Sequence, residues 1–521
     1  MTTAPRALTL TSTLALILTL AAGAVPAAAA PASAPGAPGA SGASVACEHL
    51  GVGTGDGQGR EHGGMPAACP GDRTASVLYF QDGHEIMPVA QDDGERGGVA
   101  RLATVVDEQR ALHPEAALAF GGDLAGGTLF GGIYRGAPMV DAFNEIGVDV
   151  ASFGQHDFDF GAQHTRDLVA ASAFPWVNSN LVHADDEPFL PGFPTHIQSV
   201  NGVEVGFLGL TGGMGSTSTV GEILQRDTVE AATDAVARLE AEGADVVVAL
   251  TQIDLDENVA LLEAVPGIDA AFREENSYVS ASEVTTLEDG RLILAPEGNY
   301  GSVLRLDIAP RGNDFTITYD EIQVDETVAE DPELAALATG YQDDLEAQLA
   351  APIGTAPAYL DRPAVRLIAA DALRAYDDAD FAIFNNGGAR ADIPGPQVTL
   401  RDAYSVMPFG NVVVEVEVTG AQLEAALESA SERMIPSGFT YTIDTEATGD
   451  ARVSELRTMD GAAVDPAATY TLATTNYVAA SNPALAGSAT LHRVVDVQAL
   501  IDHIVATGTL TAPEPRVTVL P

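Results

Sequence analysis

From Ala75 onward, short apolar runs rich in β-branched and aromatic residues alternate with longer stretches that have amphipathic helical spacing. Alternating strand and helix patterns of this kind are typical of an α/β domain. The apolar runs are SVLYF, AALAFGG, DVASFG, VEVGFLGL and ADVVVALT, and the helical stretches include ARLATVVDEQRALH and DAVARLEAEG. The pattern therefore predicts an α/β domain over residues 75–325.

A second folded region is predicted after an acidic helix. The first region closes near ILAPEGNYGSVLRLDI and ITYDEIQV, and residues 326–351 then carry DPELAALATGYQDDLEAQLAA, which has the spacing of an amphipathic connecting helix. Helix and strand patterns alternate again over residues 352–521, in VRLIAADALRAY, DFAIFN, VVVEVEV and GAQLEAALESASERM. We expect a second, smaller α/β or α+β domain there.

The first 74 residues have a different character. Residues 1–30 combine Arg6 with an apolar run and small residues ending AVPAAAA, which favours a cleaved secretory signal peptide over a membrane anchor. Residues 31–74 begin as a flexible Pro/Ala/Gly-rich segment and contain both cysteines of the chain, Cys47 and Cys69. In an oxidising compartment these most simply form one disulfide, because a redox or metal pair would need a motif such as CxxC. We expect a secreted, extracytoplasmic protein.

Length and charge narrow the classes of function. A chain of 521 residues is too long for a single hydrophobic core, which agrees with at least two domains. Its 74 acidic and 24 basic side chains give a formal charge of −50, which repels nucleic-acid polymers and anionic membranes. No later window is apolar for long enough to span a bilayer. We therefore expect neither a nucleic-acid polymer as partner nor stable membrane insertion.

Three predicted strand ends in the first domain lead into loops that carry potential metal ligands. Each loop alone is more typical of a capped turn than of a ligand set. Carboxylates and imidazoles at successive strand ends, however, predict ligands that converge on one cleft. The loops are QDGHE with Asp82 and His84, GGDLAGG with Asp123, and GQHDFDFG with His156, Asp157 and Asp159.

In the order and context of these motifs, the chain resembles the 5′-nucleotidase family over nearly all of its mature length. The D-x-H motif of the family is matched by Asp82 and His84, its bridging aspartate by Asp123, and its GNH[ED]-x-D block by GQHDFDFG. FPWVNSN, GFLGLTGG and EGNYGSVLRLDI match further strands. The resemblance implies a calcineurin-like metallophosphoesterase domain, a β-sandwich flanked by helices, at residues 75–325 and a smaller α/β substrate-binding domain at 352–521.

The resemblance also implies catalytic roles. Two metal ions that share Asp123 would activate a water molecule for attack on phosphorus. His156 would steady the transferring phosphoryl oxygens or protonate the leaving alkoxide, with Asp159 orienting its ring. The alternative is a histidine–aspartate pair that only stabilises the loop.

The second metal position departs from the family pattern. Gln155 stands in place of the family's asparagine, and Gln252, in ALTQIDLDEN, in place of a histidine. In AAFREENSY, Glu275 and Ser277 stand where two further histidines are expected.

Two outcomes of these changes are open. Oxygen ligands from Gln155, Gln252, Glu275 and Asp254 could hold a harder cation, Mg²⁺, Mn²⁺ or Ca²⁺, in place of zinc. Alternatively, the chain holds one metal on Asp82, His84 and Asp123, or none. Asp254 could instead cap a helix N-terminus.

A Gly-rich turn in the second domain suits an anionic ligand. NNGGARADI places Asn385, Asn386 and Arg390 after a buried strand, where the backbone and a guanidinium group can approach an anion. It also matches the N-G/N-G-G-x-R motif of the family.

Phe409 and Asn411 follow in YSVMPFGN, and in the family this phenylalanine stacks on the nucleoside base. A core phenylalanine is the alternative. Tyr477 is present in TTNYVAASNPAL, but the turn that supplies the family's second stacking ring is absent. A base held by Phe409 alone would be bound more loosely.

The leading hypothesis is an exported phosphoric-monoester hydrolase that acts on nucleotides in their catabolism and needs one or two divalent metal ions. One alternative is a nucleotide-binding homologue whose catalysis is impaired by the changed ligands. Another is a phosphoesterase for a different ester, such as a cyclic or sugar nucleotide. In each case the partner is a small phosphate ester, and no motif assigns an oligomeric state.

Overall fold

The computed structural model describes residues 73–520, apart from 92–93, 193, 218, 220, 275–279, 313, 409, 431–432, 448–451 and 486–488. The predicted signal peptide and the predicted Cys47–Cys69 disulfide lie outside the described residues. Within the described part of the chain, none of the helices combines the length and the apolar character needed to cross a membrane.

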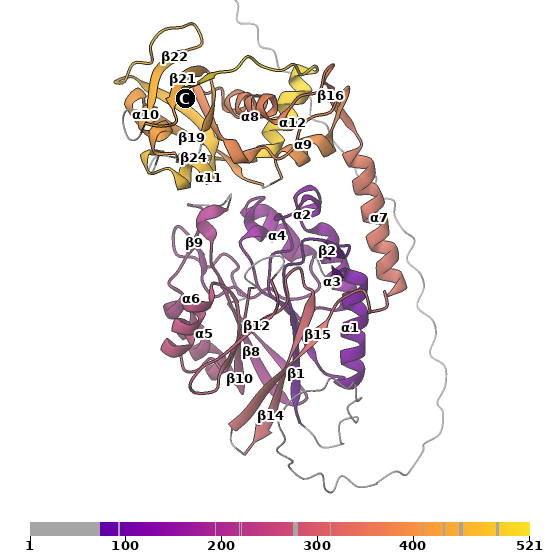
Figure 1. Cartoon of the computed structure of the whole chain (residues 1–521). Coiled ribbons are helices and arrows are strands. Elements are labelled where there is room, and N and C mark those ends of the chain that lie inside the picture. The colour runs from indigo at the N-terminus through magenta and orange to yellow at the C-terminus, as the bar shows by residue number, and fades with distance from the viewer. Residues whose placement is uncertain are drawn as a thin grey trace, which may run out of the picture. The chain divides into compact units, whose positions relative to one another are not determined.

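The N-terminal half contains two β-sheets that pack face to face, with helices on both outer sides (Figure 1). The first sheet has the order β15 (Asp314–Gln323), β14 (Ser302–Arg311), β1 (Ala75–Phe80), β4 (Ala117–Phe120) and β5 (Val150–Ala151). The second has the order β12 (Glu283–Thr286), β13 (Leu292–Ala295), β11 (Ala270–Arg273), β10 (Val246–Gln252), β8 (Val203–Thr211) and β7 (Thr195–Val200).

Helices cover the outer face of each sheet, which confirms the predicted sandwich flanked by helices. On the side of the first sheet lie α1 (Val99–Leu112), α2 (Leu129–Tyr134), α3 (Ala137–Ile146) and α4 (Ala162–Ala171). On the side of the second sheet lie α5 (Thr228–Glu242) and α6 (Leu255–Ala264). Two small antiparallel two-stranded sheets also lie in this half, namely β2 (Val89–Gln91) with β3 (Gly94–Arg96) and β6 (Leu181–His183) with β9 (Ile223–Gln225).

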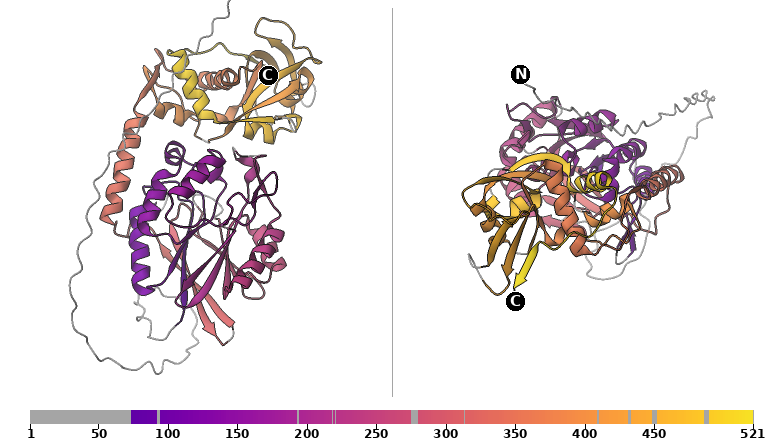
Figure 2. Two further views of the ribbon diagram at one scale, coloured as in Figure 1. Left: turned by 180° about the vertical axis from the view of Figure 1, so that it is seen from behind. Right: turned by 90° about the horizontal axis from the view of Figure 1, so that it is seen from above.

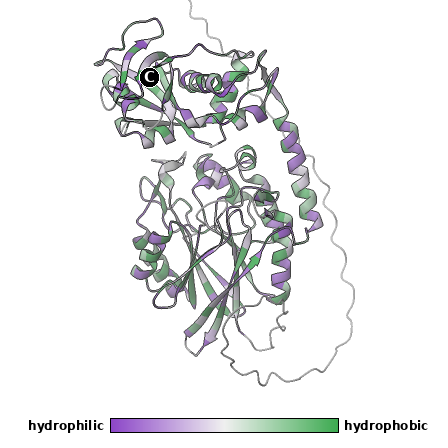
Figure 3. Cartoon of the chain, in the orientation of Figure 1, coloured by the Kyte–Doolittle hydropathy of each residue, from purple (hydrophilic) through white to green (hydrophobic). Residues whose placement is uncertain are grey.

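The space between the two sheets is a continuous apolar core. Alternate residues of β1, such as Val77 and Tyr79, face Val248 of β10 and Phe272 of β11, as expected for strands whose successive side chains point to opposite faces. The rings of Tyr79 and Phe272 stack across the interface, with centroids 4.2 Å apart and planes inclined by 7°. The core strands are accordingly coloured mainly as hydrophobic in Figure 3.

Helix α7 (Pro332–Leu349) lies within the segment 326–351 for which the sequence predicts a helix. It begins after Asp331, whose side chain accepts hydrogen bonds from the backbone nitrogens of Glu333 (3.0 Å) and Leu334 (2.9 Å). Leu334 and Leu345 join the same core as α1 and α3. Hydrophilic and hydrophobic residues alternate along the helix, as expected for an amphipathic one (Figure 3).

The C-terminal part, residues 352–520, is built around one five-stranded sheet, visible from two directions in Figure 2. Its strand order is β20 (Met434–Ser437), β17 (Phe381–Asn385), β23 (Thr469–Thr475), β19 (Val412–Thr419) and β24 (Ala489–Val495). One face is covered by α8 (Arg362–Asp377), α9 (Leu400–Val406) and α12 (Asp496–Thr507).

The opposite face of this sheet packs against two helices and a small second sheet. The helices are α10 (Gly420–Ser429) and α11 (Asn476–Ser481), and the small sheet contains β22 (Val453–Thr458), β21 (Phe439–Asp444) and β25 (Val517–Leu520). A further pair joins β16 (Pro352–Thr355) to β18 (Gln397–Thr399). Helices on both sides of a mixed sheet confirm the predicted α/β class of this region.

Candidate active site

The candidate ligands lie where parallel strands of both sheets end. In the first sheet β1 runs parallel to β4, and β4 to β5; in the second, β8, β10 and β11 are parallel neighbours. Loops that follow the carboxyl ends of parallel strands meet at one edge of the sheet. Here β1 leads to Asp82 and His84, β4 to Asp123, and β5 to Gln155 and His156, while β10 ends at Gln252 and β11 leads to Glu274.

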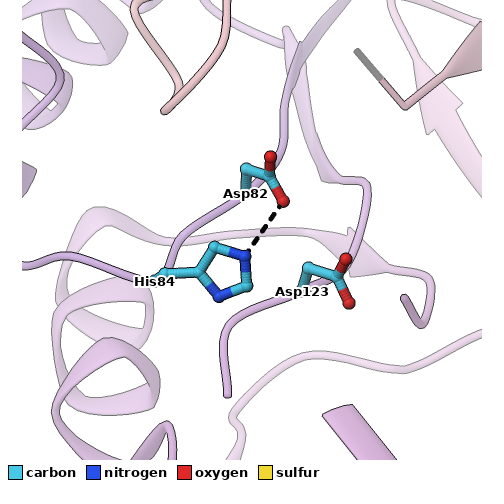
Figure 4. A group of neighbouring side chains, drawn as sticks. All are labelled: Asp82, His84 and Asp123. Carbon is cyan, nitrogen blue, oxygen red and sulfur yellow. Dashed lines mark ion pairs between the residues drawn. The ribbon is translucent and has the colours of Figure 1, made fainter. Parts of the chain in front are cut away.

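Asp82, His84 and Asp123 form a buried cluster (Figure 4). One ligand atom of each side chain lies within 4.8 Å of those of the other two, and His84 Nε2 is 3.2 Å from Asp82 Oδ1. Within the described part of the chain, His84 Nδ1 and Asp123 Oδ2 are buried without a hydrogen-bond partner. Buried polar atoms are normally satisfied. Two carboxylates and an imidazole with such open valences fit a divalent cation.

The backbone holds two of these side chains in uncommon conformations. Asp82 and Asp123 have φ angles of 58° and 64°, in the left-handed region that non-glycine residues adopt only uncommonly. The buried carboxylate of Asp157 stabilises the Asp123 loop, because it accepts hydrogen bonds from the backbone nitrogens of Asp123 (3.0 Å), Leu124 (2.9 Å) and Gly154 (3.0 Å). A side chain at Gly154 would place its Cβ 2.0 Å from Asp123 Oδ1, so this position needs glycine.

His156 lies beside this cluster and is paired with Asp159. Its Nδ1 is 2.7 Å from Asp159 Oδ2, and its backbone nitrogen donates to Asp123 Oδ1 at 2.8 Å. The ring centroids of His156 and His84 are 5.4 Å apart. Burial lowers the pKa of His156, but the Asp159 hydrogen bond and the charge of Asp123 outweigh this and raise the pKa to about 10. These neighbours thus favour the protonated form of the ring.

Glu274 is a site residue that the sequence analysis missed. The side-chain amide of Gln252 lies against the carboxylate of Glu274. When the amide nitrogen faces Glu274, it donates hydrogen bonds to Oε1 at 3.2 Å and to Oε2 at 2.6 Å. Gln155 also hydrogen-bonds to this carboxylate. Burial, and then the charge of Asp82, raise the pKa of Glu274 to about 7. Glu275, the predicted ligand, lies outside the described residues.

The alternation of residues in and after β11 could have predicted that Glu274 faces the site. Ala270 and Phe272 face the core between the sheets, so the next residue on that face after β11 is Glu274. Asp254, the other candidate oxygen ligand, instead caps α6 and accepts a hydrogen bond from the backbone nitrogen of Glu257 at 2.9 Å. The structure thus favours the capping interpretation of Asp254.

The predicted substrate residues of the C-terminal part lie at one edge of its sheet. Asn385 ends β17 and is buried, and Asn386–Gly388 form a single 3-10 turn directly after it. Arg390 is exposed, while its backbone nitrogen donates to the carbonyl oxygen of Val406 at 2.9 Å. The turn is therefore anchored, with the arginine side chain at the surface.

Asn411 and Tyr477 lie at the same edge, because β23 is parallel to β17 and antiparallel to β19. Tyr477 is 57% exposed, on helix α11. The amide nitrogen of Asn411 donates to Asp496 Oδ2 at 3.1 Å, which gives this side chain a structural contact. Phe409 lies outside the described residues.

Comparison with known proteins agrees with this arrangement. The profile of the "5'-nucleotidase, C-terminal domain" matches residues 360–485. A 5'-nucleotidase of Bos taurus is 23% identical over 424 residues, which cover 71% of this chain and 73% of that protein. The C-terminal part of the chain thus matches a 5′-nucleotidase domain, and most of the chain is similar in sequence to 5′-nucleotidases.

Further proteins extend the similarity. The structure of a putative 5'-nucleotidase from Staphylococcus aureus shares the fold with a TM-score of 0.64 and 20% identity, covering 86% of this chain and 99% of that one. "Endonuclease YhcR" of Bacillus subtilis (strain 168) is 27% identical over 462 residues, covering 79% of this chain. The match spans 37% of the length of that relative.

Proposed function

We propose that the protein is an exported, metal-dependent hydrolase of nucleotide phosphate esters. The observation that carries the proposal is the buried cluster of Asp82, His84 and Asp123, in which Asp123 Oδ2 has no hydrogen-bond partner among the described residues. A divalent cation held by these three side chains would act as a Lewis acid on a phosphoryl oxygen and increase the acidity of water. Similarity to proteins named 5'-nucleotidase supports nucleotides as substrates.

His156 then has the geometry of a general acid. Its hydrogen bond to Asp159 uses Nδ1 and leaves Nε2 to face a ligand, while its side chain retains 35% exposure. A protonated imidazole in this position can donate a proton to the leaving oxygen or a hydrogen bond to the phosphoryl group. Asp159 fixes the orientation of the ring.

The C-terminal domain, proposed at residues 352–521, would bind the organic part of the substrate. Asn385, Asn386 and Arg390 offer amides and a guanidinium group to an anionic or polar ligand. Asn411, Tyr477 and Phe409 complete the proposed site, with Phe409 as the ring that stacks on the base. The signal peptide proposed at residues 1–30 would deliver the protein out of the cytoplasm.

The test is phosphate release from a panel of nucleoside monophosphates, with Mg²⁺, Mn²⁺, Ca²⁺ and Zn²⁺ added separately. We expect release with at least one cation, and a loss of about 10²- to 10⁴-fold in kcat for His156→Asn, the range of a missing general acid. Asp185→Asn, an exposed residue far along the chain from the ligand motifs, is the control and should retain full activity. No release with any cation contradicts the proposal, and nucleotide binding without release would favour the impaired homologue.

A further inference from the structure

Two consecutive glycines lie directly against the candidate active site. A Cβ added at Gly127 would lie 2.7 Å from His84 Cε1, and one added at Gly126 would lie 2.3 Å from Asp159 Oδ2. Gly127 therefore faces the buried cluster, and Gly126 faces the carboxylate that is paired with His156. Because both glycines have positive φ angles, 72° and 69°, a larger residue at either position would also be strained.

The chain continues from these glycines into α2, which ends just before Arg135. At Gly132, within α2, an added Cβ would meet no atom within 4 Å, so open space lies in front of this part of the helix. One cavity is bordered by Gly126, Gly127, Gly132, Arg135 and Asp159. Arg135 thus faces the same space as the carboxylate of Asp159.

Several contacts hold Arg135 in a defined position. Its backbone has a φ angle of 54°, and its nitrogen donates to the carbonyl oxygen of Gly131 at 2.7 Å. Its own carbonyl oxygen lies 2.7 Å from Nε2 of His164, which joins the end of α2 to α4, its neighbour in Figure 1. Its guanidinium carbon, Cζ, lies 4.9 Å from the ring centroid of Phe160, the residue directly after Asp159.

The guanidinium group of Arg135 carries a charge that no carboxylate neutralises. Within the part of the chain that the structure describes, no carboxylate oxygen lies within 4.0 Å of it. Partners are abundant in a chain with 74 acidic and 24 basic side chains, and Arg96, Arg101 and Arg110 each pair with one, at 2.6, 2.7 and 3.0 Å. An exposed guanidinium that packs on a ring and keeps its donors open suits bidentate binding of a phosphate group.

We propose that Arg135 is a specificity-determining residue that binds a phosphate group on the leaving side of the substrate, and that nucleoside diphosphates are therefore substrates. The inference rests on the proposed function and deepens it, because it names a substrate class. The proposed general acid, His156, serves the leaving oxygen, and its partner Asp159 borders the cavity together with Arg135. A leaving group that extends past this pair into the cavity reaches the guanidinium group.

The reaction with a nucleoside diphosphate transfers the terminal phosphoryl group to water. The oxygen of water bonds to the terminal phosphorus, and the bond from this phosphorus to the bridging oxygen breaks. The bridging oxygen stays on the inner phosphate and takes a proton from His156, which a proton of the water replaces. The products are a nucleoside monophosphate and inorganic phosphate. A nucleoside monophosphate has no inner phosphate, so Arg135 should matter less for its binding.

The test compares phosphate release from ADP and from AMP by the full-length protein with its activating cation. Arg135→Gln removes the charge and keeps a polar side chain, so we expect KM for ADP to rise about ten-fold or more, with little change in kcat. KM for AMP should change by less than about three-fold. Arg166→Gln is the matched control and should leave both KM values unchanged. Arg166 Cζ lies 5.4 Å from the ring centroid of Phe189, in a similar contact, but Arg166 does not border the cavity.

A binding measurement separates recognition of the phosphate group from a structural role. α,β-Methylene ADP has carbon in place of the bridging oxygen and is not cleaved, so isothermal calorimetry measures its binding alone. Arg135→Gln should weaken this binding about ten-fold without lowering the melting temperature, and Arg135→Lys, which keeps the charge but loses the planar fork, should weaken it less.

Three results would overturn the inference and leave the proposed function standing. They are an equal rise in KM for ADP and AMP in Arg135→Gln, binding of the analogue by Arg135→Gln as tight as by the wild type, and a wild type that hydrolyses AMP but not ADP. If the wild type releases phosphate from neither nucleotide with any divalent cation, the proposed function itself fails.

Discussion

At the scale of single residues, Asp496 is a buried carboxylate that makes stability depend on pH. It is 2% exposed and accepts hydrogen bonds from Asn411 Nδ2 and from the backbone nitrogen of Val497. Burial nevertheless raises its pKa to about 7. The folded protein therefore binds this proton more tightly than the unfolded chain, whose aspartates titrate near pH 4. The contribution of Asp496 to stability is complete below about pH 4 and is lost as the pH rises to about 7.

Asp496→Asn removes the titration and keeps one acceptor oxygen, so one of the two hydrogen bonds is lost at every pH. We expect the difference in melting temperature, variant minus wild type, to increase by a few degrees from pH 5 to pH 8. About 1 kcal/mol shifts Tm by roughly 2–4 °C in a domain of this size. Differential scanning fluorimetry across that range checks this. Asp502→Asn, exposed on the same helix, should show a difference that does not change with pH. A constant difference for Asp496→Asn as well would contradict the prediction.

Glu274 and its amide partners could not be found by comparing sequence motifs alone. Matching AAFREENSY to the family motif position by position along the chain gives Glu275 as the ligand. Glu274 is the residue on the inner face after β11, because side-chain direction depends on where the strand ends and on the pleat. The first half was predictable because Asp82, His84 and Asp123 are themselves the family residues. The amide contacts of Gln155 and Gln252 depend on rotamers, which a sequence does not contain.

At the scale of elements, the sheets were predicted well because their strands bury one or both faces. VRLIAADALRAY, DFAIFN and VVVEVEV correspond to α8, β17 and β19. Three-residue strands such as β2, β3 and β6 were not predicted, since a period of two cannot be recognised over so few positions. Helix α11 was also missed, because its six residues are too few to show an amphipathic period.

The stacked pair of Tyr79 and Phe272 joins the two sheets just before the ligand loops begin. Phe272→Ala removes a buried ring, and the remaining cavity should lower the free energy of unfolding by about 3–5 kcal/mol, whereas Phe272→Leu should lower it by less. Urea unfolding checks this. Tyr319→Ala is the control, because Tyr319 is 46% exposed on β15 and its loss should change stability by about 0.5 kcal/mol or less. Equal effects of Phe272→Ala and Tyr319→Ala would contradict the role given to the stacked pair.

For the whole molecule, the net charge of −50 destabilises the folded state through repulsion between like charges. Like charges repel across a compact surface, and salt screens them over a Debye length of about 10 Å at 0.1 M. We expect the melting temperature, measured with EDTA present, to increase when NaCl is raised from about 10 mM to 0.5 M. Tetramethylammonium chloride at equal ionic strength should give a similar increase. An increase with NaCl alone would indicate specific sodium binding in place of screening.

The two sheets of the sandwich contribute different side chains to one site, and this separation has a practical consequence. Asp82, His84 and Asp123 follow strands of the first sheet, whereas Gln252 ends β10 and Glu274 follows β11 in the second. Substitutions at the ends of β10 and β11 can therefore change one side of the site, while His156 and the Asp82, His84 and Asp123 cluster stay on the loops of the other sheet. The two sheets therefore form two parts of one site that can be varied separately.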